Sequence, residues 1–180
     1  MQEDPPKYGG SNYRKISILG DGDCGYYSLI HGLLLIKRDH PHFDLKFLDG
    51  LRLANDRRTV KYPDWAVSQI KNLINADDDH WLETDDFPIV TGFWNICILT
   101  WDRNSKIWWH HKSPNIWESL PGLYGCEHVL FFHHQLTRDG DGDHWSLLTL
   151  KTDWQPPEPP AELLEFYERQ DLIMKFKAVL

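Results

Sequence analysis

The fold of this chain is organised around one stretch, Leu19-Gly20-Asp21-Gly22-Asp23-Cys24-Gly25-Tyr26-Tyr27-Ser28-Leu29. A turn rich in glycine and aspartate ends at a single cysteine, and an apolar helical pattern begins there. Tyr27, Ile30 and Leu34 recur at three- and four-residue spacing, as on the buried face of a helix. Asp23 is the predicted N-cap, and the pattern continues for about four turns.

Cys24 therefore lies at or near the N-terminus of the predicted helix. The positive end of a helix dipole favours the thiolate form of a cysteine over the thiol. Backbone N–H groups of the preceding turn could also stabilise an oxyanion that forms beside the sulfur. A buried structural cysteine after an ordinary loop is the alternative, and its position alone does not decide between the two.

Composition limits the classes of function. The chain has 180 residues, 41% of them hydrophobic, which indicates one soluble globular domain, expected to be a monomer. Its net charge of −8 argues against a nucleic-acid partner, because phosphate binding needs a basic face. The longest wholly apolar run, residues 33–36, is far too short to span a membrane, so no membrane partner is expected.

Cysteine content and the polar start of the chain bear on the compartment. Three cysteines cannot all pair with one another, and a chain of 180 residues does not need disulfides for stability. We therefore expect reduced thiols and a cytoplasmic location, which would be the host cytosol for a viral protein or a bacterial effector. The first residues do not resemble a signal peptide.

The pattern along the chain predicts an α+β domain at residues 13–153. A flexible lead-in at 1–12 precedes it, and a proline-rich linker at 154–160 and an amphipathic helix at 161–180 follow it. Besides the first helix, we expect helices at 44–58 and about 65–74, and a mostly helical segment at 81–93. Strands are expected at 13–19, 95–101, 106–110, 128–135 and 144–150.

The other cysteines and the acidic turns are better explained by structure than by chemistry. Cys97 lies on a strand that is apolar on both faces and is therefore assigned to the core. Cys126 has no helix behind it. The acidic run at 77–79 reads as a solvated loop. The alternating aspartates at 139–143 fail as a calcium loop, because Leu150 occupies the twelfth position, where a glutamate is required. A hairpin turn explains them better.

A cysteine nucleophile needs a base, and His144 is the best candidate. His31 shares the helix with Cys24 but lies about 10 Å further along it, too far for direct proton transfer. The adjacent pairs at 110–111 and 133–134 point to opposite faces of their strands, so neither pair can chelate one metal. His144 opens a strand after a tight turn, and Ser146 shares its face, where a polar group could orient the imidazole.

These residues together resemble the ovarian-tumour (OTU) family of cysteine proteases. The segment 21–26, Asp-Gly-Asp-Cys-Gly-Tyr, is similar to the family signature Asp-Gly-(Asn/Asp)-Cys-x-aromatic. Asp143-His144-Trp145 resembles the segment with the catalytic histidine and its following aromatic residue. Residues 81–83 and 95–99 are similar to the family's Trp-then-Glu region and the strand after it. The similarity runs from about residue 13 to 150.

The resemblance implies a papain-like OTU fold, with a small central, mostly antiparallel sheet flanked by helices and the nucleophile at a helix N-terminus. Cys24 would be the nucleophile and His144 the general base and then acid. Asp21, Gly22 and Cys24 would supply backbone N–H groups to the oxyanion. The implied activity is deubiquitination, the hydrolysis of isopeptide bonds at the C-terminus of ubiquitin, of polyubiquitin chains or of a ubiquitin-like modifier. No metal or cofactor is implied.

One position departs from the family pattern. The family has Asp or Asn two residues after the histidine, whereas this chain has Ser146. A hydroxyl can accept the imidazole N–H bond but adds no charge to stabilise an imidazolium. Ser146 or Asp21, or an aspartate from another segment, is left for the third catalytic role. The departure indicates a divergent member, viral or bacterial.

Two other readings stay open. The same Cys–His arrangement serves papain-like cysteine proteases of other families. The serine at position 146 would also fit a catalytically inactive ubiquitin-binding module, although such a module has no chemical need for Cys24 or His144.

Overall fold

The structure is a computed structural model, and it describes residues 13–36, 59–114, 126, 128–136 and 143–150. Its described elements are three α-helices, one 3-10 turn and five strands, in the order β1 (Tyr13–Ile16), α1 (Cys24–Leu35), α3 (Asp64–Leu73), η1 (Thr84–Asp86), α4 (Phe87–Trp94), β2 (Cys97–Asp102), β3 (Ile107–His111), β4 (Val129–Leu136) and β5 (Asp143–Leu150).

The five strands form one sheet in the order β1-β5-β4-β2-β3. The pairs β1–β5, β2–β3 and β4–β5 are antiparallel, and the central pair β2–β4 is parallel. In this register Tyr13 lies opposite Leu150, and His133 lies opposite Ser146. β4, which follows the edge strand β3 in the sequence, therefore lies inside the sheet, between β5 and β2.

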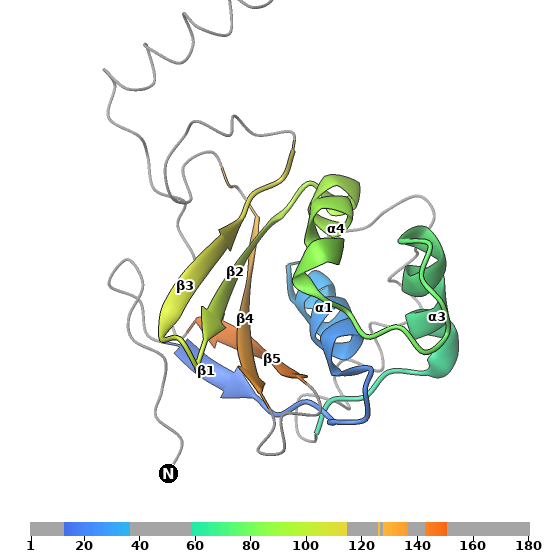
Figure 1. Ribbon diagram of the computed structural model, residues 1–180, viewed down its shortest axis with the longest axis horizontal. Helices are drawn as coiled ribbons and strands as arrows, with labels where there is room; N and C mark the ends of the chain where they lie inside the picture. The colour runs from blue at the N-terminus through green and yellow to red at the C-terminus, as the bar shows by residue number, and fades with distance from the viewer. Residues whose placement is uncertain (1–12, 37–58, 115–125, 127, 137–142, 151–180) are drawn as a thin grey trace, which may run out of the picture.

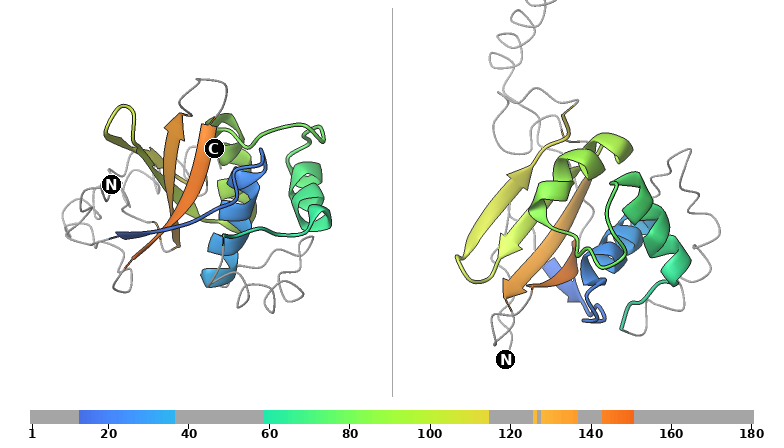
Figure 2. Two further views of the ribbon diagram at one scale, coloured as in Figure 1. Left: turned by 90° about the horizontal axis from the view of Figure 1, so that it is seen from below. Right: turned by 45° about the vertical axis from the view of Figure 1, so that its right-hand side comes forward.

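The α-helices described by the structure all lie on one face of the sheet, with α1 and α4 against the strands and α3 further out (Figures 1 and 2). On that face the core joins the helices to side chains such as Leu130, Phe132 and Leu147. A second apolar cluster, which includes Leu99, Phe131 and Leu148, lies on the opposite face. Both faces of the central strands are therefore buried, as the uninterrupted apolar run of β2 predicts.

Helix α1 is buried along almost its whole length, because it lies between the sheet and the outer helix α3 (Figure 1). Gly32 allows this close packing, since a methyl group built on it would lie 2.8 Å from Leu130 of β4. The first residue of this buried helix is Cys24. The core thus fixes the position of the cysteine.

The predicted α+β class is confirmed, as are the first helix, the helix near 65–74 and five strands in a mostly antiparallel sheet flanked by helices. In the segment 81–93 the helical part begins only at η1 and α4, with Pro88 in the first turn of α4. The predicted helix at 44–58, the segments 1–12, 154–160 and 161–180, and the acidic turn at 138–142 lie outside the described residues.

The expectation of reduced thiols is wrong for two of the three cysteines. Cys97, the first residue of β2, and Cys126 form a disulfide with a Cα–Cα distance of 5.9 Å. The parallel pairing of β2 with β4 brings them together, because Cys126 comes shortly before β4. Spacing along the chain does not reveal such a pair, since 29 residues separate the two cysteines. Both are buried, so the assignment of Cys97 to the core holds.

Among the described residues, no helix is both long and apolar enough to cross a membrane.

Candidate active site

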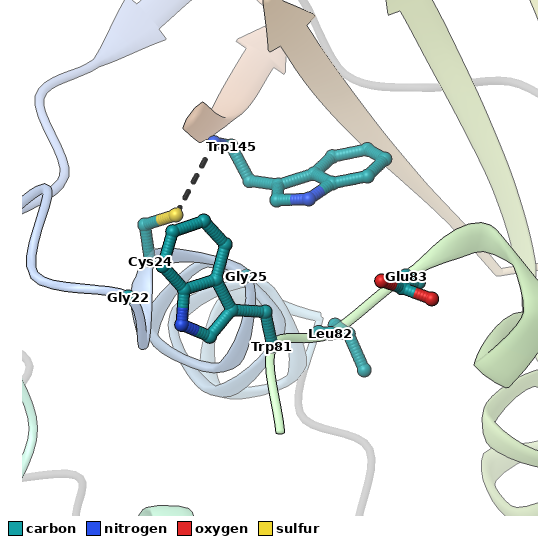
Figure 3. Close-up of a pocket in the computed structure, with 7 residues that line it drawn as sticks. All are labelled: Gly22, Cys24, Gly25, Trp81, Leu82, Glu83 and Trp145. Carbon is teal, nitrogen blue, oxygen red and sulfur yellow. Dashed lines mark hydrogen bonds between the residues drawn. The ribbon is translucent and has the colours of Figure 1, made fainter. Parts of the chain in front are cut away.

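Cys24 is the first residue of α1 and does not take part in a disulfide. It is buried, with 3% of its surface exposed. The backbone N–H of Trp145, at the start of β5, donates a hydrogen bond to its sulfur over 3.4 Å. The cysteine motif and the histidine motif, 121 residues apart in the chain, therefore meet at the sulfur atom (Figure 3).

The turn before Cys24 is held by its own side chains. Asp21 accepts a hydrogen bond from the backbone N–H of Asp23 (3.2 Å) and another from the hydroxyl of Tyr27 (2.8 Å), one turn into the helix. Gly22 has a φ of 91°, a left-handed conformation that glycine adopts without strain. Asp23 is the N-cap residue as predicted, but its side chain makes no capping hydrogen bond.

His144 lies beside this turn. A methyl group built on Gly20 would be 3.4 Å from its Nδ1, so the imidazole packs against the backbone that leads to Cys24. The next residue, Trp145, is buried on the helix side, where its ring meets Phe87 at a centroid distance of 5.6 Å. Because the indole ring is anchored in the core, the start of β5 is held at the N-terminus of α1.

Burial controls the proton affinity of both groups. It raises the pKa of the Cys24 thiol, and the Asp21 carboxylate adds to this effect, while the N–H groups of Trp145 and Gly25 oppose it. Burial also lowers the pKa of His144, as does the positive charge of Lys15. At neutral pH the two groups are therefore a thiol and a neutral imidazole, and not a preformed ion pair.

A small pocket opens beside the sulfur, lined by Gly22, Cys24, Gly25, Trp81, Leu82, Glu83 and Trp145 (Figure 3). One wall is Trp81, which is 45% exposed and whose indole nitrogen would lie only 2.8 Å from a methyl group on Gly22. A methyl group on Gly25 would be 2.8 Å from Leu82. Both glycines are needed for the close approach of the segment 81–83 to the cysteine.

The segment 81–83 is fixed by a hydrogen-bonded capping box. The carboxylate of Asp86 accepts a bond from the backbone N–H of Glu83 (2.9 Å) and lies 2.8 Å from Nε2 of His80. Asp86 thus holds both His80, directly before the segment, and Glu83, at its end. These contacts all join residues close in sequence.

Among the described residues, no histidine lines the pocket beside Cys24. His31 is fully buried in α1, and its Nδ1 lies 2.7 Å from the hydroxyl of Tyr62, as expected of a core histidine. His111 and His133 are also largely buried, which lowers the pKa of each to about 4 and keeps both neutral. No group of three or more metal-ligating side chains occurs among the described residues.

Ser146 is buried in β5, two residues after His144, and lies opposite His133 of β4. Among the described residues, no hydrogen bond joins its hydroxyl to the His144 ring. The assignment of Ser146 or Asp21 as the third member of the site therefore stays a prediction. Asp21 itself is engaged with the turn and with Tyr27.

If Cys24 and His144 act as nucleophile and base, Ser146→Ala is expected to lower kcat by no more than about fivefold, which corresponds to the loss of one neutral hydrogen bond. Ser146→Asn, which restores an amide found in the resembled family, should keep the activity. Ser113→Ala, which removes another buried serine hydroxyl, controls for general loss of stability. A drop of about a hundredfold in kcat for the folded Ser146→Ala variant would instead make Ser146 a full member of a catalytic triad.

Sequence reasoning missed two features of the site. The Trp145 N–H bond to the sulfur is a backbone contact, which leaves no trace in a sequence. Lys71 reaches Asp23 from α3, where it falls on the buried face next to Ile70. The sequence does contain a signal for this contact, because a lysine on the apolar face of a helix needs an acidic partner for its charge.

Comparison of the chain with protein-family models, with curated proteins and with solved structures found no match.

Proposed function

We propose that this protein is a cysteine isopeptidase with a papain-like arrangement of the OTU type, acting on the C-terminus of ubiquitin or of a ubiquitin-like modifier. One observation carries the proposal. The Asp-Gly-Asp-Cys motif and the Asp-His-Trp motif, chosen from the sequence alone, meet at a 3.4 Å hydrogen bond between Trp145 N and Cys24 Sγ. The contact brings residues 121 positions apart in the chain to the sulfur, and it places the residue that follows His144 at the N-terminus of α1.

The chemistry follows from the protonation states. Neutral His144 takes the proton from the Cys24 thiol as the sulfur attacks the carbonyl carbon of the scissile bond. The oxyanion then forms near the N-terminus of α1, where the backbone N–H groups of Asp21, Gly22 and Cys24 are its predicted donors. His144 returns the proton to the leaving amine, and water hydrolyses the thioester that remains on Cys24.

The shape of the pocket favours a substrate without side chains near the scissile bond. Trp81 closes over Gly22, and Leu82 packs against Gly25, so the space beside the sulfur is narrow. We expect a chain that ends in glycine to fit such a space better than one with larger residues. The diglycine end of ubiquitin meets this requirement.

A cytosolic site of action stays a prediction, and the Cys97–Cys126 disulfide argues against a reducing compartment.

The test is covalent capture by ubiquitin that carries an electrophile at its C-terminus. The full chain should form a one-to-one adduct, and peptide mapping should place it on Cys24. A matched probe in which the two terminal glycines are replaced by alanines should react far more slowly. Failure of the folded protein to react with probes of ubiquitin and of ubiquitin-like modifiers would refute the proposal. Rapid capture by unrelated peptide electrophiles would favour a papain-like protease of another family.

The pH dependence of the rate is a further expected result. The base works only as neutral imidazole, and the pKa of His144 lies below its ordinary value of 6.5. Activity should therefore persist as the pH falls and decline only below about 6.5. The thiol, whose pKa is raised above 9.0, stays protonated across the neutral range. A kcat/KM profile measured from pH 4 to 10 checks this, and a half-maximal rate above about pH 7 on the acid side would contradict it.

A further inference from the structure

Lys71 of α3 is buried, with 7% of its surface exposed. Its ammonium group lies 3.2 Å from a carboxylate oxygen of Asp23, the residue directly before the nucleophile. It also donates a hydrogen bond to the backbone carbonyl of Asp78 and lies 5.1 Å from the centroid of the Tyr26 ring. A buried lysine is tolerated when its charge is paired and its N–H groups are engaged, and here both conditions hold.

The pairing decides what the Asp23 side chain does. At the N-cap position an aspartate ordinarily accepts a hydrogen bond from the first turn of its helix. The Asp23 side chain makes no such bond and turns to Lys71 instead. The first amides of α1, which lie closest to the sulfur, are thus not occupied by the carboxylate of Asp23.

The surroundings of the cysteine are acidic. Asp21 and Asp23 belong to the turn, while Glu83 and Asp86 approach from the segment before α4, and His144 lies on the side of β5. Burial raises the pKa of Tyr26, and the charges of Asp86, Asp23 and Glu83 raise it further. The charge of Asp21 contributes to the raised pKa of the Cys24 thiol. Asp23 is the turn carboxylate that forms an ion pair with Lys71.

We propose that Lys71 is a positioning residue for Cys24: its ammonium group holds the Asp23 carboxylate away from the helix N-terminus and neutralises it, so that the sulfur can ionise during attack. This inference rests on the proposed function only in taking Cys24 as the nucleophile. It can be measured without any ubiquitin substrate, through the reaction of the thiol with iodoacetamide.

The experiment follows the rate of alkylation of Cys24 against pH, with the modified peptide quantified by mass spectrometry. The midpoint of this curve is the pH at which alkylation reaches half of its maximal rate. Loss of the cation in Lys71→Met should raise this midpoint by about 0.5 to 1 pH unit, which corresponds to a three- to tenfold slower reaction at pH 7. Asp23→Asn, which leaves the cation, should move it down. The double variant should return near the wild-type midpoint, and Lys71→Arg should stay there. Lys106→Met, at the exposed β2–β3 turn, is the matched control and should cause no shift.

Opposite shifts that cancel in the double variant would support the proposal, because a purely structural role would not be rescued by removing a second partner. An unchanged midpoint in Lys71→Met, or an upward shift in Asp23→Asn, would overturn it. If Lys71→Met does not fold, the other two variants test the proposal: the midpoint should fall in Asp23→Asn and stay unchanged in Lys71→Arg. A chain that displays these shifts but cleaves no ubiquitin substrate would refute the proposed function and leave the role of Lys71 intact.

Discussion

Cys24→Ala is expected to abolish isopeptide cleavage, with a fall in kcat of at least about 10⁴-fold. The substitution removes only the bond-forming sulfur atom, which lies at the N-terminus of a helix otherwise held by the core. Ubiquitin should therefore still bind, with a dissociation constant close to that of the wild type. Cleavage of fluorogenic and chain substrates measures the loss, and calorimetry or fluorescence anisotropy measures the retained binding.

The other two cysteines supply the control. Because Cys97 and Cys126 are joined, the matched variant replaces both with alanine, which avoids an unpaired buried thiol. Loss of the disulfide is expected to lower the free energy of unfolding by about 3 kcal/mol without changing kcat for the folded protein. The assignment of Cys24 as the nucleophile is wrong if the folded double variant is inactive while the Cys24→Ala variant still cleaves substrate.

His144→Ala is expected to give the second-largest effect, a fall in kcat of about 10³- to 10⁴-fold. The pKa of the thiol is raised by burial, so little thiolate is present at neutral pH and attack depends on a base. Because the thiolate fraction grows with pH, the loss should shrink as the pH rises toward 9. A pH series of single-turnover rates for the two proteins tests this relation.

The control for this variant is His31→Gln, which removes the imidazole of α1 but keeps a side chain able to hydrogen-bond Tyr62. It should alter stability far more than rate, since His31 lies about 10 Å along the helix from the sulfur. Equal losses of kcat in the two folded variants would show that the base had been assigned to the wrong residue.

The proposed mechanism uses the Cys24 thiol, the His144 imidazole, backbone N–H groups and one water molecule, and it requires no metal or cofactor. The third residue of the site would be the one that orients the His144 imidazole. Asp21 is hydrogen-bonded within the turn, and Ser146 lies opposite the neutral His133. If neither orients the imidazole, the packing of His144 on Gly20 has to do so, and the Ser146 series separates these cases.

The sequence by itself determined the local elements of this protein. The helix after Cys24, the strand at Cys97–Asp102 and the strand at Asp143–Leu150 follow from apolar periodicity, which depends on residues close in the chain. The turn before Cys24 could also be predicted, because glycine and aspartate favour it for local steric and hydrogen-bonding reasons. The choice of Cys24 and His144 as candidates required no coordinates.

Only the tertiary structure decided which of these elements meet. The parallel pairing of β2 with β4 joins segments separated by a long connection, and it brings Cys97 to Cys126 against the prediction of free thiols. The bond from Trp145 N to the sulfur and the contact of Lys71 with Asp23 likewise join distant segments. Such contacts depend on how helices and sheet pack together, and a backbone N–H carries no residue-specific signal, so sequence periodicity could not predict them.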